Sequence, residues 1–343
     1  MRKDRVTVIF PSQPTGNHDV ATGLSRAFQL LGHATDAIPY HKFFKQWQEY
    51  YRFFNIINGT AMEFDTEDTI KSASLNIVIA VMQTDPDCVV IVDGTGLHKN
   101  GWEWLRRLGI KTIVYSTESP YQDKFVAHVA QIADKTFVND YNSAERMGLE
   151  YLPVGYDSEV HHPMIVSDKY RCDVSFVGSG FSERVDILSG VDWTGIDLKL
   201  IGHYKIGLDH ILEPYYADTF ISNAHASLMY NGAKISLNLN RTSVDYDAIE
   251  TIPEAVSLSP RAYEIAACGG FMISQYRPEI EMVFGDLVPT FNTSEELEDL
   301  VHYWLDKERD DERREIGDEL ASIVRPHSYI ERAKRILEAL SAL

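Results

Sequence analysis

One short segment, residues 259–274, carries the side chains best suited to chemistry. Pro260 fits the first position of a helix, where its missing N–H costs nothing, and Ser259 before it can cap the free amides. Arg261 and Glu264 fall in the first turns of that helix. A helix start at the edge of a sheet can hold phosphates on its amides, and a carboxylate there can accept hydrogen bonds from sugar hydroxyls. The segment therefore predicts a binding site.

A second candidate site is the glycine loop Gly178, Ser179 and Gly180, which follows an apolar strand at 172–177. A glycine loop between a strand and a helix can cradle a diphosphate on its backbone amides. We expect phosphates to lie on these amides and on the helix start at 259–261. Arg261, Arg241 or Lys205 would supply the positive charge.

Strands and helices alternate through both halves of the chain. We expect strands at 6–10, 88–93, 110–115, 135–138, 172–177, 198–201, 235–239, 271–274 and 287–291, with helices between them. This rhythm predicts an α/β fold of two Rossmann-like, doubly wound domains that face each other across a cleft. The expected boundaries are 1–156 and 171–325, with 157–170 as a linker. The last helix, within 326–343, would pack back on the first domain.

Four polar residues of the first half follow predicted strands. His18 and Asp19 follow the loop after the first strand, while Asp93 and Glu118 follow two later strands. Because the carboxyl ends of parallel strands meet at one edge of a sheet, these side chains are candidates for a shared site. The simpler alternative is that they are solvated, turn or capping residues.

An aromatic stripe lies on the predicted helix at 40–54. Seven aromatic residues recur there at helical spacing: Tyr40, Phe43, Phe44, Trp47, Tyr50, Tyr51 and Phe54. They form either a platform for a sugar or a partner, or a face buried against the sheet.

The composition narrows the classes of partner. The net charge of −19 disfavours a generic nucleic-acid-binding surface, because such surfaces need many lysines and arginines. No apolar run is long enough for a membrane span, and the chain lacks a secretory leader, so we expect a cytoplasmic protein. Three scattered cysteines suggest neither a disulfide framework nor a zinc site, and we assign no metal site.

Three stretches together resemble one known family. They are residues 261–270 (RAYEIAACGG), the acidic helix 295–304 and residues 325–332 (RPHSYIER). They resemble the carboxyl-terminal half of the CgeB-like spore-maturation glycosyltransferases, which have the GT-B fold. The resemblance covers roughly 130–343 and includes 151–153 and 173–178. The amino half matches only in its alternation of strands and helices.

The resemblance implies a nucleotide-sugar donor, with a UDP-sugar expected first. The second domain would bind the donor, and the first domain would bind the acceptor without a catalytic metal. Related enzymes use two glutamates separated by seven residues. Glu264 matches the second, which holds the ribose hydroxyls, but Val256 stands where the first would be. This departure leaves the stereochemistry of transfer open.

The resemblance also implies a glycosyl transfer reaction, which places two chemical demands on the active site. A glycosyltransferase, of hexosyltransferase type, must stabilise the leaving diphosphate and remove a proton from an acceptor hydroxyl. If the transfer is inverting, His18 is the first candidate base, followed by Asp19, Asp93 and Glu118. The acceptor stays open among a glycan, a protein, a metabolite and a modified DNA base. Alternative functions are a non-catalytic nucleotide-sugar or glycan-binding protein and a sugar-nucleotide epimerase.

Overall fold

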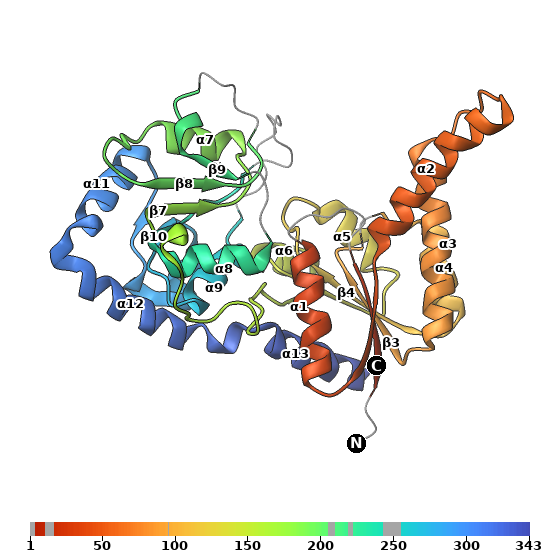
Figure 1. Ribbon diagram of the computed structural model, residues 1–343. Helices are drawn as coiled ribbons and strands as arrows, with labels where there is room; N and C mark the ends of the chain where they lie inside the picture. Colours follow the sequence, from red (N-terminus) through yellow and green to blue (C-terminus); the bar gives the residue numbers. More distant parts are fainter. Residues whose placement is uncertain (1–3, 11–16, 95, 205–209, 219–221, 243–254) are drawn as a thin grey trace. The chain divides into compact units, whose positions relative to one another are not determined.

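The computed structural model describes residues 4–10, 17–94, 96–204, 210–218, 222–242 and 255–343. The chain forms two compact units, one of residues 1–152 with 329–343 and one of residues 153–328. The described part of each unit contains a parallel sheet of six strands covered by helices (Figure 1). The predicted α/β fold with two Rossmann-like sheets is therefore confirmed.

The sheet of the first unit runs in the order β2-β1-β3-β4-β5-β6. Its strands are β1 (Arg5–Ile9), β2 (Ala34–Ile38), β3 (Cys88–Val92), β4 (Lys111–Ser116), β5 (Lys135–Val138) and β6 (Glu150–Tyr151). All neighbouring pairs are parallel, and Val6 of β1 lies opposite Cys88 of β3. The carboxyl ends of the strands therefore meet at one edge, as the sequence required.

Alternate side chains of these strands face two helical layers. Val6 and Val8 pack with α1 (Asn17–Leu30) and α13 (Tyr329–Ala342). Val89 and Ile91 point the other way, toward α2 (Tyr40–Asn58), α3 (Thr66–Thr84), α4 (Lys99–Arg107) and α5 (Asp123–Val129). Burying an aliphatic side chain stabilises a fold by about 1.5–3 kcal/mol. Because both faces of this sheet carry such side chains, each face needs its own layer of helices. The last helix of the chain thus completes the first unit.

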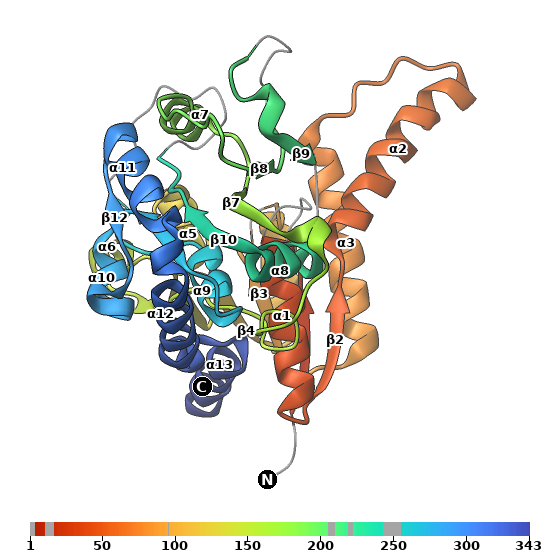
Figure 2. The same ribbon diagram turned by 60° about the vertical axis from the view of Figure 1, so that its left-hand side comes forward.

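Helices α2 and α3 form a long hairpin that extends beyond the sheet (Figures 1 and 2). Residues of α2 near the sheet pack into the core, and Tyr40 is buried. Farther along the helix, Tyr50 is 49% exposed, and Tyr51 and Phe54 are half-buried. The aromatic stripe is therefore a core face at one end of α2 and an accessible surface at the other.

The sheet of the second unit runs in the order β12-β11-β10-β7-β8-β9. Its strands are β7 (Cys172–Val177), β8 (Leu198–Ile201), β9 (Tyr216–Asp218), β10 (Ala233–Asn238), β11 (Met272–Gln275) and β12 (Thr290–Phe291). One face packs with α7 (Ser182–Ser189) and α11 (Ser294–Leu305). The other face packs with α8 (Asn223–Gly232), α9 (Pro260–Ala267), α10 (Pro278–Phe284) and α12 (Asp310–Ile323). Residues 157–170, expected as a linker, lie in this unit, with Asp157 and His161 buried.

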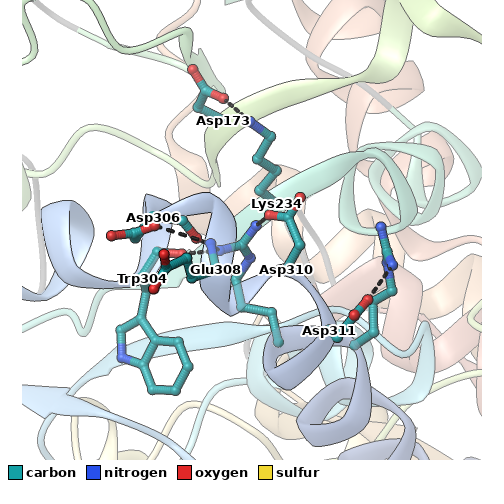
Figure 3. A network of polar contacts seen from close by, with 9 residues as sticks. Asp173, Lys234, Trp304, Asp306, Glu308, Asp310 and Asp311 are labelled. Carbon is teal, nitrogen blue, oxygen red and sulfur yellow. Dashed lines mark hydrogen bonds and ion pairs between the residues drawn. The ribbon is translucent and has the colours of Figure 1, made fainter.

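A buried arginine, Arg313, fixes the corner between α11 and α12. Its partners Trp304, Asp306 and Asp310 are labelled in Figure 3. Arg313 donates to the carbonyl oxygens of Trp304 and Asp306 and pairs with Asp310. Nearby, Lys234 of β10 pairs with Asp173 of β7 at 2.8 Å. The contacts of Arg313 satisfy carbonyls that the end of α11 would otherwise leave without donors.

Several elements differ from the sequence-based expectation. β2, β9, α6 (Tyr141–Met147) and α8 were not predicted. The strand expected at 287–291 is shorter, because Gly285–Leu287 form a 3₁₀ turn before β12. The described residues include no helix with the length and hydropathy needed to cross a membrane.

Candidate functional site

Three arginines gather at the carboxyl ends of β7 and β10 in the second unit. Arg184, Arg241 and Arg261 interact electrostatically around two aromatic rings. The guanidinium of Arg261 lies 4.8 Å from the ring centre of Phe176, and that of Arg241 lies 5.4 Å from the ring centre of Phe181. Three mutually repelling cations at a sheet edge form a site suited to a polyanion.

Arg261 is held in place by the ends of two strands. Its Nε donates to the carbonyl of Val177 at 2.5 Å, and its Nη1 donates to the carbonyl of Leu239 at 3.1 Å. Planar guanidinium groups keep a fixed orientation when several of their N–H groups are bound. Arg261 lies at the start of helix α9, as the sequence predicted, and its guanidinium lies beside Gly178 of the glycine loop.

Arg184 belongs to the same cluster, although it was not among the predicted site residues. It is buried, and it donates to the carbonyl of Ser179 at 2.9 Å and to that of Asn240 at 3.1 Å. Burial, together with the charges of Arg261 and Arg241, lowers the pKa of Arg184 to about 9. Its place in the first turn after a glycine loop was the available sign, but its burial depends on contacts with distant strands.

The glycine loop differs from its expected role. The amide of Gly178 donates to the carbonyl of Ile201 at 2.8 Å, and that of Gly180 donates to the carbonyl of His203 at 2.9 Å. These two amides are therefore not free to hold phosphate, and the expectation that all three amides cradle it is wrong. Among the described residues, only the Ser179 amide of this loop lacks a protein acceptor.

The two glycines instead make room for side chains. A Cβ on Gly178 would collide with the Arg261 guanidinium, and a Cβ on Gly180 would collide with the Tyr204 ring. Glycine is the residue type that permits such close approach. The loop thus contributes to the site by admitting Arg261, with the Ser179 amide beside it.

Ser259 also has a different role from the one expected. Its side chain does not cap α9 but donates to Oδ1 of Asn238 at 3.2 Å. The same oxygen accepts from Nη1 of Arg261 at 3.4 Å, and Nδ2 of Asn238 donates to Ser274 at 2.9 Å. Asn238 therefore links the end of β10 to the start of α9, a role the sequence did not reveal.

Glu264 lies one turn after Arg261 on α9 and is 8% exposed. Tyr230 of α8 donates a hydrogen bond to its Oε2 at 3.4 Å. Burial raises the pKa of Glu264 to about 7, against the opposing effects of Arg261 and Tyr230. A carboxyl group with such a pKa, close to a cationic cluster, is a candidate for ligand binding.

Two buried polar atoms near the cluster have no hydrogen-bond partner among the described residues. They are the hydroxyl oxygen of Tyr204 and Oδ1 of Asn240. Burial also raises the pKa of Tyr204. Unpaired buried polar atoms are costly in a folded protein, so their presence beside the arginines favours a ligand-binding edge.

The other positions of interest from the sequence in the second unit are Arg241, Lys205 and Val256. Arg241 is half-buried, and its carbonyl accepts from Arg277 at 2.8 Å. Lys205 lies outside the described residues. Val256 is half-buried, and its carbonyl accepts from the Glu279 amide at 3.2 Å. Glu279 is buried and accepts from the amide of Leu258, so a glutamate supports this loop from α10.

The candidates of the first unit lie at the carboxyl edge of its own sheet. Asp93 is buried, with φ of 61°, and its Oδ1 accepts from both the amide and the hydroxyl of Thr117 at 2.9 Å. Glu118, next to Thr117, is half-buried, and Asp19 is exposed in the first turn of α1. His18 is helical, but its side chain is outside the described set, as is most of the loop before it. Asp93 thus fixes the loop after β4.

The described residues contain no group of three or more histidine, cysteine, aspartate or glutamate side chains placed to hold a metal ion. His161, the first of the two adjacent histidines at 161–162, is buried, and its Nε2 lies 3.2 Å from Oδ1 of Asn223. Burial lowers the pKa of His161 to about 4. This histidine is therefore a neutral part of the core of the second unit.

Comparisons with known proteins relate this chain to a family and to a fold. Residues 174–338 match a family described as glycosyl transferase-like. The chain is 22% identical over 246 residues to the spore protein CgeB of Bacillus subtilis (strain 168), covering 68% of this chain and 75% of that protein. These matches confirm the resemblance to the CgeB-like glycosyltransferase family.

Two solved structures illustrate the shared architecture. A glycosyltransferase from Rickettsia africae ESF-5 superimposes with a TM-score of 0.63 at 11% identity, covering 100% of this chain and 99% of that one. A structure described as trehalose-6-phosphate from E. coli bound with UDP-2-fluoro glucose gives a TM-score of 0.63 at 12% identity, covering 99% of both chains. The architecture is that of the GT-B fold. The family match over residues 174–338 supports a glycosyltransferase.

Proposed function

We propose that this glycosyltransferase transfers a hexosyl group from a UDP-sugar to a hydroxyl-bearing acceptor without a metal ion. The observation that carries the proposal is the cluster of Arg184, Arg241 and Arg261 beside the free Ser179 amide, with Glu264 one helical turn away. This arrangement offers positive charge for a diphosphate and a carboxylate for two neighbouring hydroxyls.

Each residue would have a distinct role in donor binding. Arg261 and Arg241 contact the diphosphate, while Arg184, whose N–H groups are bound to two carbonyls, adds positive charge from behind. Glu264 accepts hydrogen bonds from the ribose. As the sugar carbon separates from the diphosphate, negative charge grows on the phosphate oxygens, and fixed guanidinium groups stabilise that charge.

UDP is the proposed nucleotide because a structure of the same fold is described as bound with UDP-2-fluoro glucose. We place the acceptor on the first unit, where Asp19, Glu118 and His18 remain candidates for the base. Asp93 would act by holding the loop that carries Glu118, since its Oδ1 already accepts two hydrogen bonds from Thr117. The three cysteines are free and buried, which agrees with a reducing cytoplasm.

The test is release of UDP from a panel of UDP-sugars, with a cell extract as the source of acceptors. We expect acceptor-dependent release that persists in EDTA and is lost in Arg261→Ala and Glu264→Ala. Arg314→Ala serves as a matched control, because Arg314 is exposed on α12 and pairs only with Asp311 among the described residues.

Other outcomes would point to the alternative functions. UDP binding without any release would indicate a non-catalytic binding protein. Isomerisation of the sugar without an acceptor would indicate an epimerase. Loss of activity in EDTA that is restored by a divalent cation would contradict the proposed metal independence.

A further inference from the structure

The hairpin of α2 and α3 contains a pocket of about 590 Å³ far along the chain from the arginine cluster. It is formed where the end of α2, the connection and the start of α3 meet. Among its lining residues are Gln48, Tyr51, Glu63, Phe64 and Thr66. This volume falls in the range of small-molecule sites.

The apolar wall of the pocket is aromatic. The rings of Tyr51 and Phe64 are stacked at 4.2 Å between centres, and Phe54 meets Phe64 edge-on at 5.6 Å. Tyr51 and Phe64 are only half-buried, so part of this cluster stays accessible. Accessible aromatic rings provide the flat apolar surface on which the C–H groups of a sugar ring can pack.

The polar wall has unused hydrogen-bonding capacity. The side chains of Gln48, Glu63 and Thr66 have no partner among the described residues. A glutamine offers donors and acceptors, a threonine hydroxyl offers both, and a carboxylate accepts. Neighbouring sugar hydroxyls need this mixture, because each hydroxyl donates one hydrogen bond and accepts others.

The charge of the pocket disfavours phosphates and other anions. Its lining contains Arg52, which pairs with Glu49 at 3.8 Å, and two carboxylates, Glu63 and Asp65. The lining thus carries one more negative than positive charge, whereas a phosphate site requires an excess of cations. A neutral ligand rich in hydroxyls fits these groups.

The pocket is also rigidly framed. Oδ1 of Asn55 accepts from the Met62 amide and the Thr60 hydroxyl, each at 2.9 Å, and its Nδ2 donates to the Met62 carbonyl at 2.6 Å. The hydroxyls of Tyr51 and Ser72 lie 2.6 Å apart across the two helices. A wall that is already ordered lowers the entropy cost of binding a ligand.

From this combination we infer that the hairpin pocket binds a neutral oligosaccharide. The pocket lies in the first unit. Its role as part of the acceptor site rests on the proposed function, but binding of the saccharide does not require the nucleotide. The sugar stacks against the Tyr51 and Phe64 cluster, while Gln48, Glu63 and Thr66 bind its hydroxyls.

The experiment titrates the full chain with maltotriose, cellotriose and chitotriose in the absence of nucleotide, followed by NMR saturation transfer and calorimetry. We expect saturable binding of at least one saccharide. Phe64→Ala and Gln48→Ala should each weaken that binding about tenfold or more. The matched controls are Phe53→Ala and Gln83→Ala, exposed residues of the same two helices that do not line the pocket.

Two results would overturn the inference. One is that none of the three saccharides binds saturably to the folded protein, whether or not it binds UDP. The other is that Phe53→Ala weakens binding as much as Phe64→Ala. Saccharide binding that persists while UDP binding is absent would instead contradict the proposed donor site. Because Phe64→Ala can perturb the hairpin, the exposed variant Gln48→Ala provides an independent measurement.

Discussion

At the scale of single residues, Glu264 shows how burial and ligand binding oppose each other. A carboxylate binds two hydroxyls best when it is ionised, yet burial favours its neutral form and raises its pKa to about 7. Arg261 and Tyr230 act against burial and favour the charged form. A neighbouring ligand with hydroxyl groups would favour ionisation further, so binding and deprotonation are expected to be coupled.

This coupling predicts how the stability of the free protein depends on pH. The folded pKa of Glu264 is higher than its usual 4.5, so the folded state holds the proton more tightly than the unfolded state. Its contribution is present in full below pH 4.5 and is lost as the pH rises toward 7. Glutamine does not titrate, so the Glu264→Gln variant lacks this loss. The difference in unfolding free energy between the variant and the wild type should therefore shift in favour of the variant from pH 5 to pH 8, by on the order of 3 kcal/mol.

Denaturation in urea at the two pH values measures this difference. Glu281→Gln is the matched control, because Glu281 is exposed on α10 in the same unit. If Glu264→Gln and the wild type lose stability in parallel from pH 5 to pH 8, the shifted pKa is wrong.

The sequence revealed the site residues that lie next to a recognisable helix-start signal. Pro260 marked the helix start, so Arg261 and Glu264 could be placed relative to it. Arg184 and Asn238 could not be found in this way. Besides the nearby Ser179 carbonyl, Arg184 depends on the Asn240 carbonyl 56 residues away, and Asn238 depends on Ser259, 21 residues away. Only the folded sheet brings these distant groups near.

At the scale of elements, the glycine loop after β7 has a packing role that its sequence conceals. Gly-x-Gly suggests amides bound to phosphate, but the amides of Gly178 and Gly180 bind carbonyls near the end of β8. What the glycines supply is space for Arg261 and Tyr204. The loop follows β7, as expected, but among its three amides in the described structure only that of Ser179 lacks a protein acceptor.

Gly178→Ala tests this packing role. The added methyl group must displace the Arg261 guanidinium, so UDP affinity should fall about tenfold, a loss of about 1.4 kcal/mol. Ser179→Ala is the control, because it removes a hydroxyl and leaves the backbone amide. Isothermal titration with UDP measures both, and equal affinities for the two variants would contradict the packing role.

Strands were predictable from the sequence where all their residues are buried and therefore apolar. β3 is buried throughout, and its apolar run 88–92 was clear in the sequence. β2 was missed because Ala34–Ile38 is an edge strand whose burial alternates irregularly. α8 was missed because its sequence, NAHASLMYNG, combines asparagine and glycine with few strongly apolar residues.

At the scale of the whole molecule, the strand and helix rhythm predicted two similar sheets, and the structure has them. The course of the chain between them is less regular. After the second unit ends at Ser328, the chain returns to the first unit as α13. We expected this last helix to pack back on the first domain, and α13 packs there with Val6 and Val8. Its hydrophobic face alone does not specify that partner, because a buried stripe fits any apolar surface of suitable shape.

The return of α13 predicts that the two units respond differently to mutation and ligand. Tyr329 is 2% exposed and packs against Gly23 of α1, so Tyr329→Ala should destabilise the first unit by about 3–5 kcal/mol. UDP should stabilise only the second unit, by about 2.7 kcal/mol at 100 times its dissociation constant. The matched variant Phe291→Ala removes a buried ring of the second unit instead.

Scanning calorimetry can separate these effects, because two-unit proteins need not unfold in one transition. Tyr329→Ala should lower one transition and leave the UDP-dependent transition in place, whereas Phe291→Ala should lower the transition that UDP raises. If both variants shift a single transition equally, the two units unfold as one. In that case the loss of α13 would weaken donor binding as well, and the carboxyl-terminal helix would link the stability of both units.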